Sequence, residues 1–150
     1  MIRILIDADA CPVKDETYRV AERYKVPVVV VSNSPIRVPQ SALIARKLVS
    51  DAFDAADDWI VENTAAGTVV ITADILLADR CLKLDADVLA PNGKPFTMAS
   101  IGGAIATRAI MADLRADGDV IGGPPPFSKQ DRSRFLSSLD QVLVKLQRRG

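Results

Sequence analysis

The chain has 150 residues, of which 49% are hydrophobic, and this is enough to form one domain with a substantial core. Its 19 Lys and Arg residues balance its 19 Asp and Glu residues, which excludes a disordered acidic tail and a uniformly basic nucleic-acid-coating protein. It has no histidine, so Ser-His-Asp catalysis, Cys-His catalysis and histidine metal ligands are excluded.

The first 90 residues alternate short apolar runs with longer amphipathic segments. Runs rich in Val and Ile predict strands at residues 2–6, 26–31, 47–49, 68–72 and 88–90. Helices are predicted from Pro12 to about Tyr24, from Pro39 to about Ala45, and over residues 54–62 and 74–84, the last with Thr72 or Ala73 at its start. This alternation predicts an α/β fold with a mainly parallel sheet.

The last third of the chain, from about residue 99 to 150, is predicted to be helical and to pack on that sheet. Residues 99–115 are rich in small side chains, and residues 116–126 form a connecting loop of Gly and Pro that lacks the GK[ST] of a P-loop. Ser128 and Asp131 have the spacing of a capping box. A final amphipathic helix follows them, so residues 1–150 are expected to form a single domain.

Cysteine content and hydropathy indicate where the protein works. Two cysteines are too few for a disulfide scaffold or a zinc site, which favours a reducing compartment. The short apolar run after Met1 lacks the features of an export peptide, and no run is long enough to span a bilayer. We therefore expect a cytoplasmic protein that does not contact a membrane.

Aspartates cluster where strands end. Asp7 and Asp9 follow the first strand, Asp74 follows the strand at 68–72, and Asp79 lies further along the next helix. A third group precedes that strand and comprises Asp54, Asp57 and Asp58. Because open parallel sheets bind ligands at the carboxyl ends of their strands, several of these carboxylates are expected to share one pocket. Crowded carboxylates need cations, and Mg²⁺ or Mn²⁺ prefers oxygen ligands, so the sequence predicts a metal site able to support phosphodiester cleavage.

Simpler interpretations of the same residues remain open. Asp9 or Asp74 could only cap a helix, and the group at 54–58 could be a solvated face. Cys11 precedes Pro12 at a helix start but is favoured as a small buried residue, as is Cys81.

Basic residues in the last third could bind phosphate. Arg108 and Arg115 are seven residues apart and share a helix face, where they could bind phosphate or pair with acids. The final helix carries further basic residues that could steer nucleic acid or simply be solvated: Lys129, Arg132, Arg134, Lys145, Arg148 and Arg149.

Two other functions fit the acidic residues. An apolar strand that ends in Asp-x-Asp opens the haloacid dehalogenase-type phosphatase motif, with Asp7 as nucleophile and Asp9 as acid/base. Against it, Cys11 replaces the usual Thr or Val, and no Asp-Asp pair follows the last strand. A non-catalytic nucleic-acid-binding module that keeps the acidic pocket is the third alternative.

Four motifs resemble the YaiI/YqxD family across nearly the whole chain. They are Asp7-Ala8-Asp9-Ala10-Cys11-Pro12; Ala56-Asp57 with Ile60; Thr72-Ala73-Asp74-Ile75 with Leu77-Ala78; and Gly122-Gly123-Pro124 with Phe127, Asp131-Arg132 and Phe135. This bacterial, largely uncharacterised family resembles the PIN-like nucleases.

The resemblance implies a fold and an activity. It implies one PIN-like domain, a three-layer α/β/α sandwich that hydrolyses RNA or DNA with Mg²⁺ or Mn²⁺. It further implies that Asp7, Asp57 and Asp74 are the catalytic acids, that Asp9 and Asp79 are additional metal ligands, and that RNA or single-stranded DNA is the partner.

Overall fold

The computed structural model describes residues 1–9, 11–116, 118 and 126–149. Within these residues the chain forms, in order, β1 (Arg3–Asp7), α1 (Lys14–Tyr24), β2 (Val28–Ser32), β3 (Ile44–Leu48), α2 (Ala55–Glu62), β4 (Thr68–Ile71), α3 (Ile75–Leu82), β5 (Asp87–Leu89), β6 (Pro95–Phe96), α4 (Met98–Ala116) and α5 (Lys129–Arg149). The strands form one sheet in the order β3-β2-β1-β4-β5-β6. Strands β1 to β5 run parallel and β6 is antiparallel to β5, which confirms the predicted α/β fold with a mainly parallel sheet.

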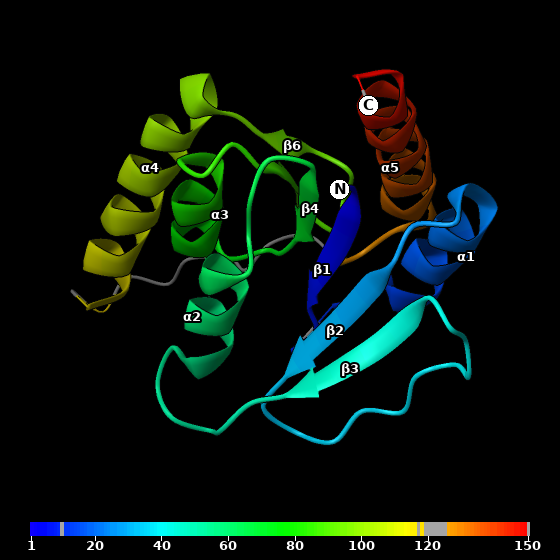
Figure 1. The fold of residues 1–150 in the computed structure, drawn as a ribbon. Coiled ribbons are helices and arrows are strands. Elements are labelled where there is room, and N and C mark those ends of the chain that lie inside the picture. Colours follow the sequence, from blue (N-terminus) through cyan, green and yellow to red (C-terminus); the bar gives the residue numbers. More distant parts are fainter. Residues whose placement is uncertain (10, 117, 119–125, 150) are drawn as a thin grey trace.

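Helices cover both faces of the sheet, and together they make three layers (Figure 1). Alternate residues of β1 point to opposite faces, as strand geometry requires. Ile4 and Ile6 belong to the cluster that contains the buried residues of α1 and α5, whereas Leu5 belongs to the cluster under α2, α3 and α4. Because both faces are covered, the strand is apolar at every interior position, and these three residues are fully buried.

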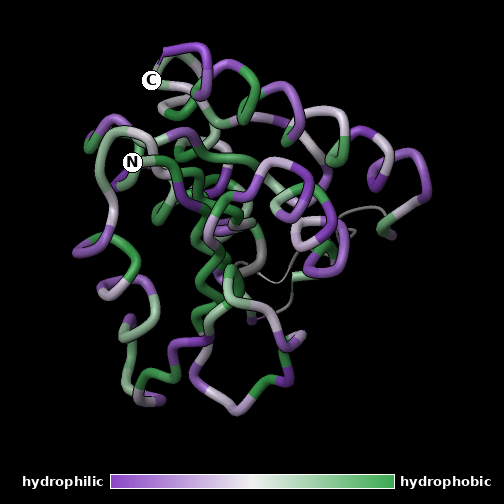
Figure 2. The backbone as a smooth tube through the Cα atoms, turned by 45° about the vertical axis from the view of Figure 1, so that its right-hand side comes forward, coloured by the Kyte–Doolittle hydropathy of each residue, from purple (hydrophilic) through white to green (hydrophobic). Residues whose placement is uncertain are grey.

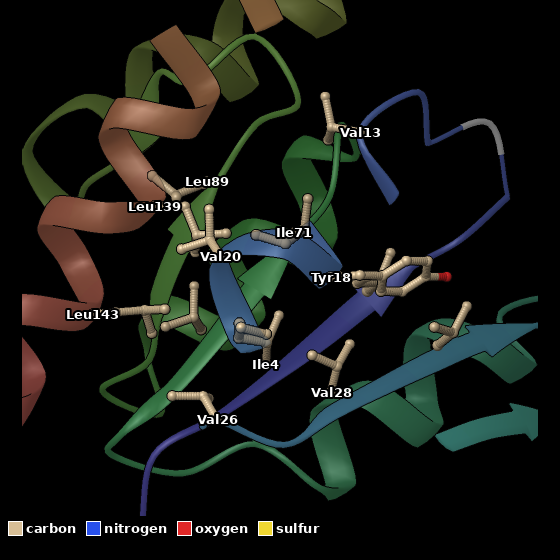
Figure 3. Packing of buried hydrophobic residues seen from close by; sticks show 14 of the residues in the cluster. Ile4, Val13, Tyr18, Val20, Val26, Val28, Ile71, Leu89, Leu139 and Leu143 are labelled. Atoms are coloured by element: carbon tan, nitrogen blue, oxygen red, sulfur yellow. The ribbon is translucent and has the colours of Figure 1, made fainter. Parts of the chain in front are cut away.

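Helix α5 is held to the α1 face by a regular apolar stripe. Phe135, Leu139 and Leu143 are fully buried at helical spacing. Figure 3 shows Leu139 and Leu143 reaching toward Leu89 and Val20, and Figure 2 shows the hydrophobic chain segments gathered in the interior strands. The predicted amphipathic final helix is therefore confirmed.

The predicted capping box at the start of α5 is also confirmed. The Asp131 backbone N–H donates to Ser128 Oγ at 3.1 Å, and the Ser128 N–H donates to Asp131 Oδ2 at 3.0 Å. The two residues thus satisfy each other's backbone donors at the helix start.

Gly93 permits the close approach of α5 to the turn before β6. It has a φ of +87°, and a Cβ there would lie 2.6 Å from the Arg134 carbonyl carbon. Ser138 Oγ donates to the Gly93 carbonyl oxygen at 2.7 Å across the same contact. A side chain at this position would push the helix away from the sheet.

One predicted helix is wrong. Residues 35–40 are irregular, and strand β3 begins at Ile44, inside the segment where a helix from Pro39 to Ala45 was predicted. Five residues of β3 pair in parallel with β2, from Val28–Ile44 to Ser32–Leu48. This pairing outweighs local helix propensity, and it also extends the strand predicted at 47–49 toward the N-terminus.

Smaller differences lie at other element ends. The antiparallel strand β6 was not predicted, because two residues carry no periodic signal. Helix α3 is capped by Asp74 rather than by Thr72 or Ala73. Most of the predicted 116–126 connector lies outside the described residues, and none of the described helices is both long and apolar enough to cross a membrane.

Candidate functional site

An open cleft of about 870 Å³ lies at the carboxyl ends of the parallel strands. Asp7 ends β1, Asn33 follows β2, Asp74 follows β4 and Pro91 follows β5, and all four line the cleft. The turn before α2 and the first turn of that helix form another wall of the cleft. Arg108 of α4 also lines the cleft. The acidic residues lining the cleft are Asp7, Asp9, Asp54, Asp57 and Asp74.

Asp7 is held at the end of the central strand. Its partial burial raises the pKa of its carboxyl, and the nearby charges of Asp9 and Asp74 raise it further. Thr72 Oγ1 donates a 2.7 Å hydrogen bond to Asp7 Oδ2, and this bond opposes the rise. The carboxylate is therefore oriented before any ligand binds.

Thr72 links the two strand ends, a role that the sequence did not reveal. Its hydroxyl is buried, and besides donating to Asp7 it accepts the backbone N–H of Asp74 at 3.0 Å. Thr72 directly follows Ile71, whose register partner is Ile6, so it lies beside Asp7. The pairing of β1 with β4 is the signal that would have identified it.

Asp74 both caps a helix and lines the cleft. Its Oδ1 accepts the backbone N–H groups of Leu76 at 2.9 Å and Leu77 at 3.3 Å, at the N-terminus of α3. The capping interpretation of this residue is therefore confirmed, and the same geometry fixes the carboxylate at the edge of the cleft.

The three mid-chain acids differ in whether their side chains line the cleft. Asp57 is half-buried in the cleft, and burial together with the charges of Asp74, Asp7 and Asp54 raises its pKa to about 6. Asp54 also lines the cleft, whereas Asp58 is exposed and accepts a 3.0 Å hydrogen bond from Arg80 Nη2. The structure therefore brings Asp57 and Asp54, but not Asp58, beside the strand-end acids.

Several predicted site residues do not line the cleft. Asp79 pairs with Lys83 at 2.9 Å. Arg132 lies 3.7 Å from Glu16, and Arg134 lies 3.5 Å from Asp131. The side chain of Arg115 lies outside the described part of the chain.

Both cysteines are buried, as predicted. Burial raises the pKa of the Cys11 thiol, although Cys11 lines the cleft, and it also raises that of Cys81. A protonated thiol is a weak nucleophile, so Cys11 is a poor candidate for a nucleophile in the cleft.

The donor chemistry of the cleft fits an oxygen-preferring divalent cation. Its acids supply carboxylate oxygens, the charges of Asp74 and Asp7 raise the pKa of Asp57, and the charges of Asp9 and Asp74 raise the pKa of Asp7. Within residues 1–9, 11–116, 118 and 126–149, no three His, Cys, Asp or Glu side chains are grouped closely enough to hold one ion. Direct coordination by three acids would therefore require side-chain adjustment.

The fold and the cleft define an α/β protein with an acidic site at the carboxyl edge of a parallel sheet. The chain belongs to the uncharacterised YaiI/YqxD family, whose model matches residues 5–145. A UPF0178 protein of Sphingopyxis alaskensis is 68% identical over 146 residues, covering 97% of this chain and 95% of the relative.

More distant relatives also match along nearly their full length. UPF0178 protein bll3966 of Bradyrhizobium diazoefficiens is 60% identical over 147 residues, covering 98% of this chain and 88% of the relative. A UPF0178 protein of Rhodopseudomonas palustris strain TIE-1 is 55% identical over 149 residues, covering 99% of this chain and 94% of the relative. No solved structure matches the chain. The family prediction is confirmed, and the relation to PIN-like nucleases stays a prediction.

Proposed function

We propose that the protein is a nuclease that uses Mg²⁺ or Mn²⁺ to hydrolyse phosphodiester bonds of RNA or DNA. The observation that carries the proposal is the meeting of Asp7, Asp57 and Asp74 in one open cleft, where the pKa of Asp57 is raised to about 6. A purely structural set of acids would be paired with bases, as Asp58 is with Arg80. Crowding of carboxylates that raises the pKa of one of them is typical of functional sites.

Asp7, Asp57 and Asp74 would hold the cation, directly or through water, with Asp9 beside them on the cleft wall. A bound divalent ion would supply activation of water and charge neutralisation at the phosphate. Asp79 remains a proposed ligand from the family resemblance alone, because its carboxylate pairs with Lys83.

The residues of the chain have distinct roles in this proposal. Thr72 orients Asp7 through its hydroxyl, and the α3 N-terminus orients Asp74. Both carboxylates are thus positioned before substrate arrives, which lowers the cost of reorganisation. Arg108 of α4 lines the same cleft, where its guanidinium can pair with a substrate phosphate.

A metal-dependent cleavage assay tests the proposal. The purified protein is incubated with RNA and DNA oligonucleotides, single-stranded and duplex, in Mn²⁺, Mg²⁺ or EDTA. Metal-dependent cleavage is expected, with loss of activity in Asp74→Asn. Asparagine still caps a helix, so the fold is kept. Asp58→Asn is the matched control, because Asp58 lies outside the cleft acids, and it should cleave as the wild type does.

The alternatives predict other results in the same experiment. Binding without cleavage in Mn²⁺ would indicate the non-catalytic module. A phosphoaspartyl adduct on Asp7 with a phosphomonoester substrate would indicate the phosphatase. Neither binding nor cleavage across the panel would overturn the proposed function.

A further inference from the structure

Phe53 leaves its aromatic ring almost entirely in water, with an exposed fraction of 93%. All the other aromatic side chains of the protein lie in, or pack against, one of the two core clusters. The protein therefore does not gain the stabilising free energy that burial of this apolar ring would contribute. A single exposed hydrophobic residue is ordinary by itself, so its place on the molecule decides its meaning.

Phe53 belongs to the turn that forms one wall of the acidic cleft, although its own side chain does not line the cleft. Its two chain neighbours, Ala52 and Asp54, both line that cleft. The turn that carries the ring is tied to the start of α2, because the Ala55 N–H donates to the Ala52 carbonyl at 3.1 Å and the Asp58 N–H donates to the Asp54 carbonyl at 2.8 Å. The ring is thus presented to solvent from a hydrogen-bonded turn beside the candidate catalytic acids.

Positive charge on the adjoining strand β3 favours binding of a polyanionic ligand. Arg46 and Lys47 are exposed on β3, the edge strand that leads into this turn. The cleft beyond the turn is acidic and repels phosphates until cations bind. An aromatic platform attracts a ligand without relying on charge, because every base has a face that can stack on it.

On the basis of the proposed nuclease function, we propose that Phe53 stacks on an unpaired base of RNA or single-stranded DNA whose backbone passes from the β3 edge into the cleft. In a duplex each base is already covered by its neighbours, whereas an unpaired base has a free face. The ring therefore makes the site selective for single strands.

Cleavage kinetics with substrates that lack single bases test this directly. One single-stranded oligonucleotide is compared with versions in which one nucleotide at a time has no base. The wild type should lose kcat/KM at one or two of these positions. Phe53→Ala should lose roughly tenfold or more on the intact strand, chiefly through KM, and show no further loss at those positions.

Three further variants separate stacking from simple apolar contact. Phe53→Trp should retain activity and Phe53→Leu should behave like Phe53→Ala, because leucine is apolar but not planar. Met98→Ala removes another exposed apolar side chain, which is 58% exposed and lies about 15 Å along α4 from Arg108. It should match the wild type.

Anisotropy with the same oligonucleotides separates failure of this inference from failure of the proposed function. If the wild type binds without cleaving, the nuclease proposal fails, and Phe53 is judged by the same comparison of dissociation constants. Equal kcat/KM of Phe53→Ala and the wild type on the intact single strand would overturn the stacking role. Full activity of Phe53→Leu, or a change of oligomeric mass in Phe53→Ala, would also overturn it, and absence of binding by the wild type would overturn both proposals.

Discussion

Thr72 Oγ1 donates a 2.7 Å hydrogen bond to Asp7 Oδ2, and this contact joins residues that are 65 positions apart in the chain. The Thr72 hydroxyl accepts the Asp74 N–H at the same time. Two of the candidate catalytic acids are therefore positioned by one buried hydroxyl.

Replacing that hydroxyl should change the ionisation of Asp7. Thr72→Val keeps the shape but removes the donor, so the Asp7 pKa should rise further, because the hydrogen bond now lowers it. The unpaired buried groups should also cost roughly 1–3 kcal/mol of stability. Carboxyl NMR titration and urea denaturation measure the two effects. Thr72→Ser is the control and should keep the Asp7 pKa near that of the wild type; an unchanged pKa in Thr72→Val would contradict the role.

Asp57 should make the metal-free protein less stable as pH rises. Its pKa of about 6 in the folded state lies above its ordinary value of 3.8, so the folded state holds the proton more tightly. The resulting stabilisation is complete below pH 3.8 and is lost as pH rises through about 6. Asp57→Asn should lack this loss and be more stable than the wild type at pH 7 by about 1 kcal/mol, after allowance for solvent screening.

Urea denaturation between pH 3.5 and 8 in EDTA measures this difference. The matched control is Asp58→Asn, since Asp58 pairs with Arg80 instead of crowding the cleft. A wild-type curve parallel to that of Asp57→Asn over the whole range would show that Asp57 is not strained by its neighbours.

Divalent metal should stabilise the folded protein. A ligand that binds only the folded state at ten times its dissociation constant adds about 1.4 kcal/mol, which raises the Tm by roughly 3–5 °C for a chain of this size. Mn²⁺ should produce this shift in the wild type and in Asp58→Asn, and EDTA should reverse it. Asp7→Asn should lose it, and a shift of the same size in that variant would place the metal elsewhere.

Gly93 should be essential for the packing of α5. Gly93→Ala introduces a Cβ 2.6 Å from the Arg134 backbone at a φ of +87°, and it should cost about 2–4 kcal/mol. Gly102→Ala is the contrasting control, because nothing lies within 4 Å of that position and it is inside α4. It should stabilise the protein by up to about 1 kcal/mol in the same urea experiment; equal effects of the two substitutions would contradict the steric explanation.

Nucleic-acid binding should depend on the arginines named from the sequence. Arg108→Ala should weaken binding and reduce the salt dependence, because Arg108 lines the cleft. If Arg132 and Arg134 also contact phosphates, replacing each with Ala should lower the log–log salt slope for a single strand by roughly 0.7. Anisotropy across a salt series measures these slopes. Unchanged slopes in the Arg132 and Arg134 variants would assign those residues to their pairs with Glu16 and Asp131.

Short-range patterns in the sequence were enough to predict most of the strands, the final helix and the edge of the sheet where the acids lie. The Val and Ile runs identified the central parallel strands, since strands covered on both faces are apolar throughout. The apolar stripe and the Ser128–Asp131 pair identified α5 in the same way. The positions of acids directly after strands predicted that their side chains share one pocket at the carboxyl edge of the sheet, and Asp7 and Asp74 do line one cleft.

Contacts between distant segments decided the rest. Pairing with β2 makes Ile44 and Ala45 part of strand β3, although the sequence predicted a helix through about Ala45 and a strand only from Lys47. Strand order places Thr72 beside Asp7, and the orientation of α2 turns Asp57 into the cleft while Asp58 meets Arg80. Propensity and periodicity act over a few neighbouring residues, but which side chains of separate elements meet depends on how the sheet pairs and the helices pack. The sequence by itself therefore determined the chemistry available at the edge of the sheet, and only the tertiary structure decided which residues share it.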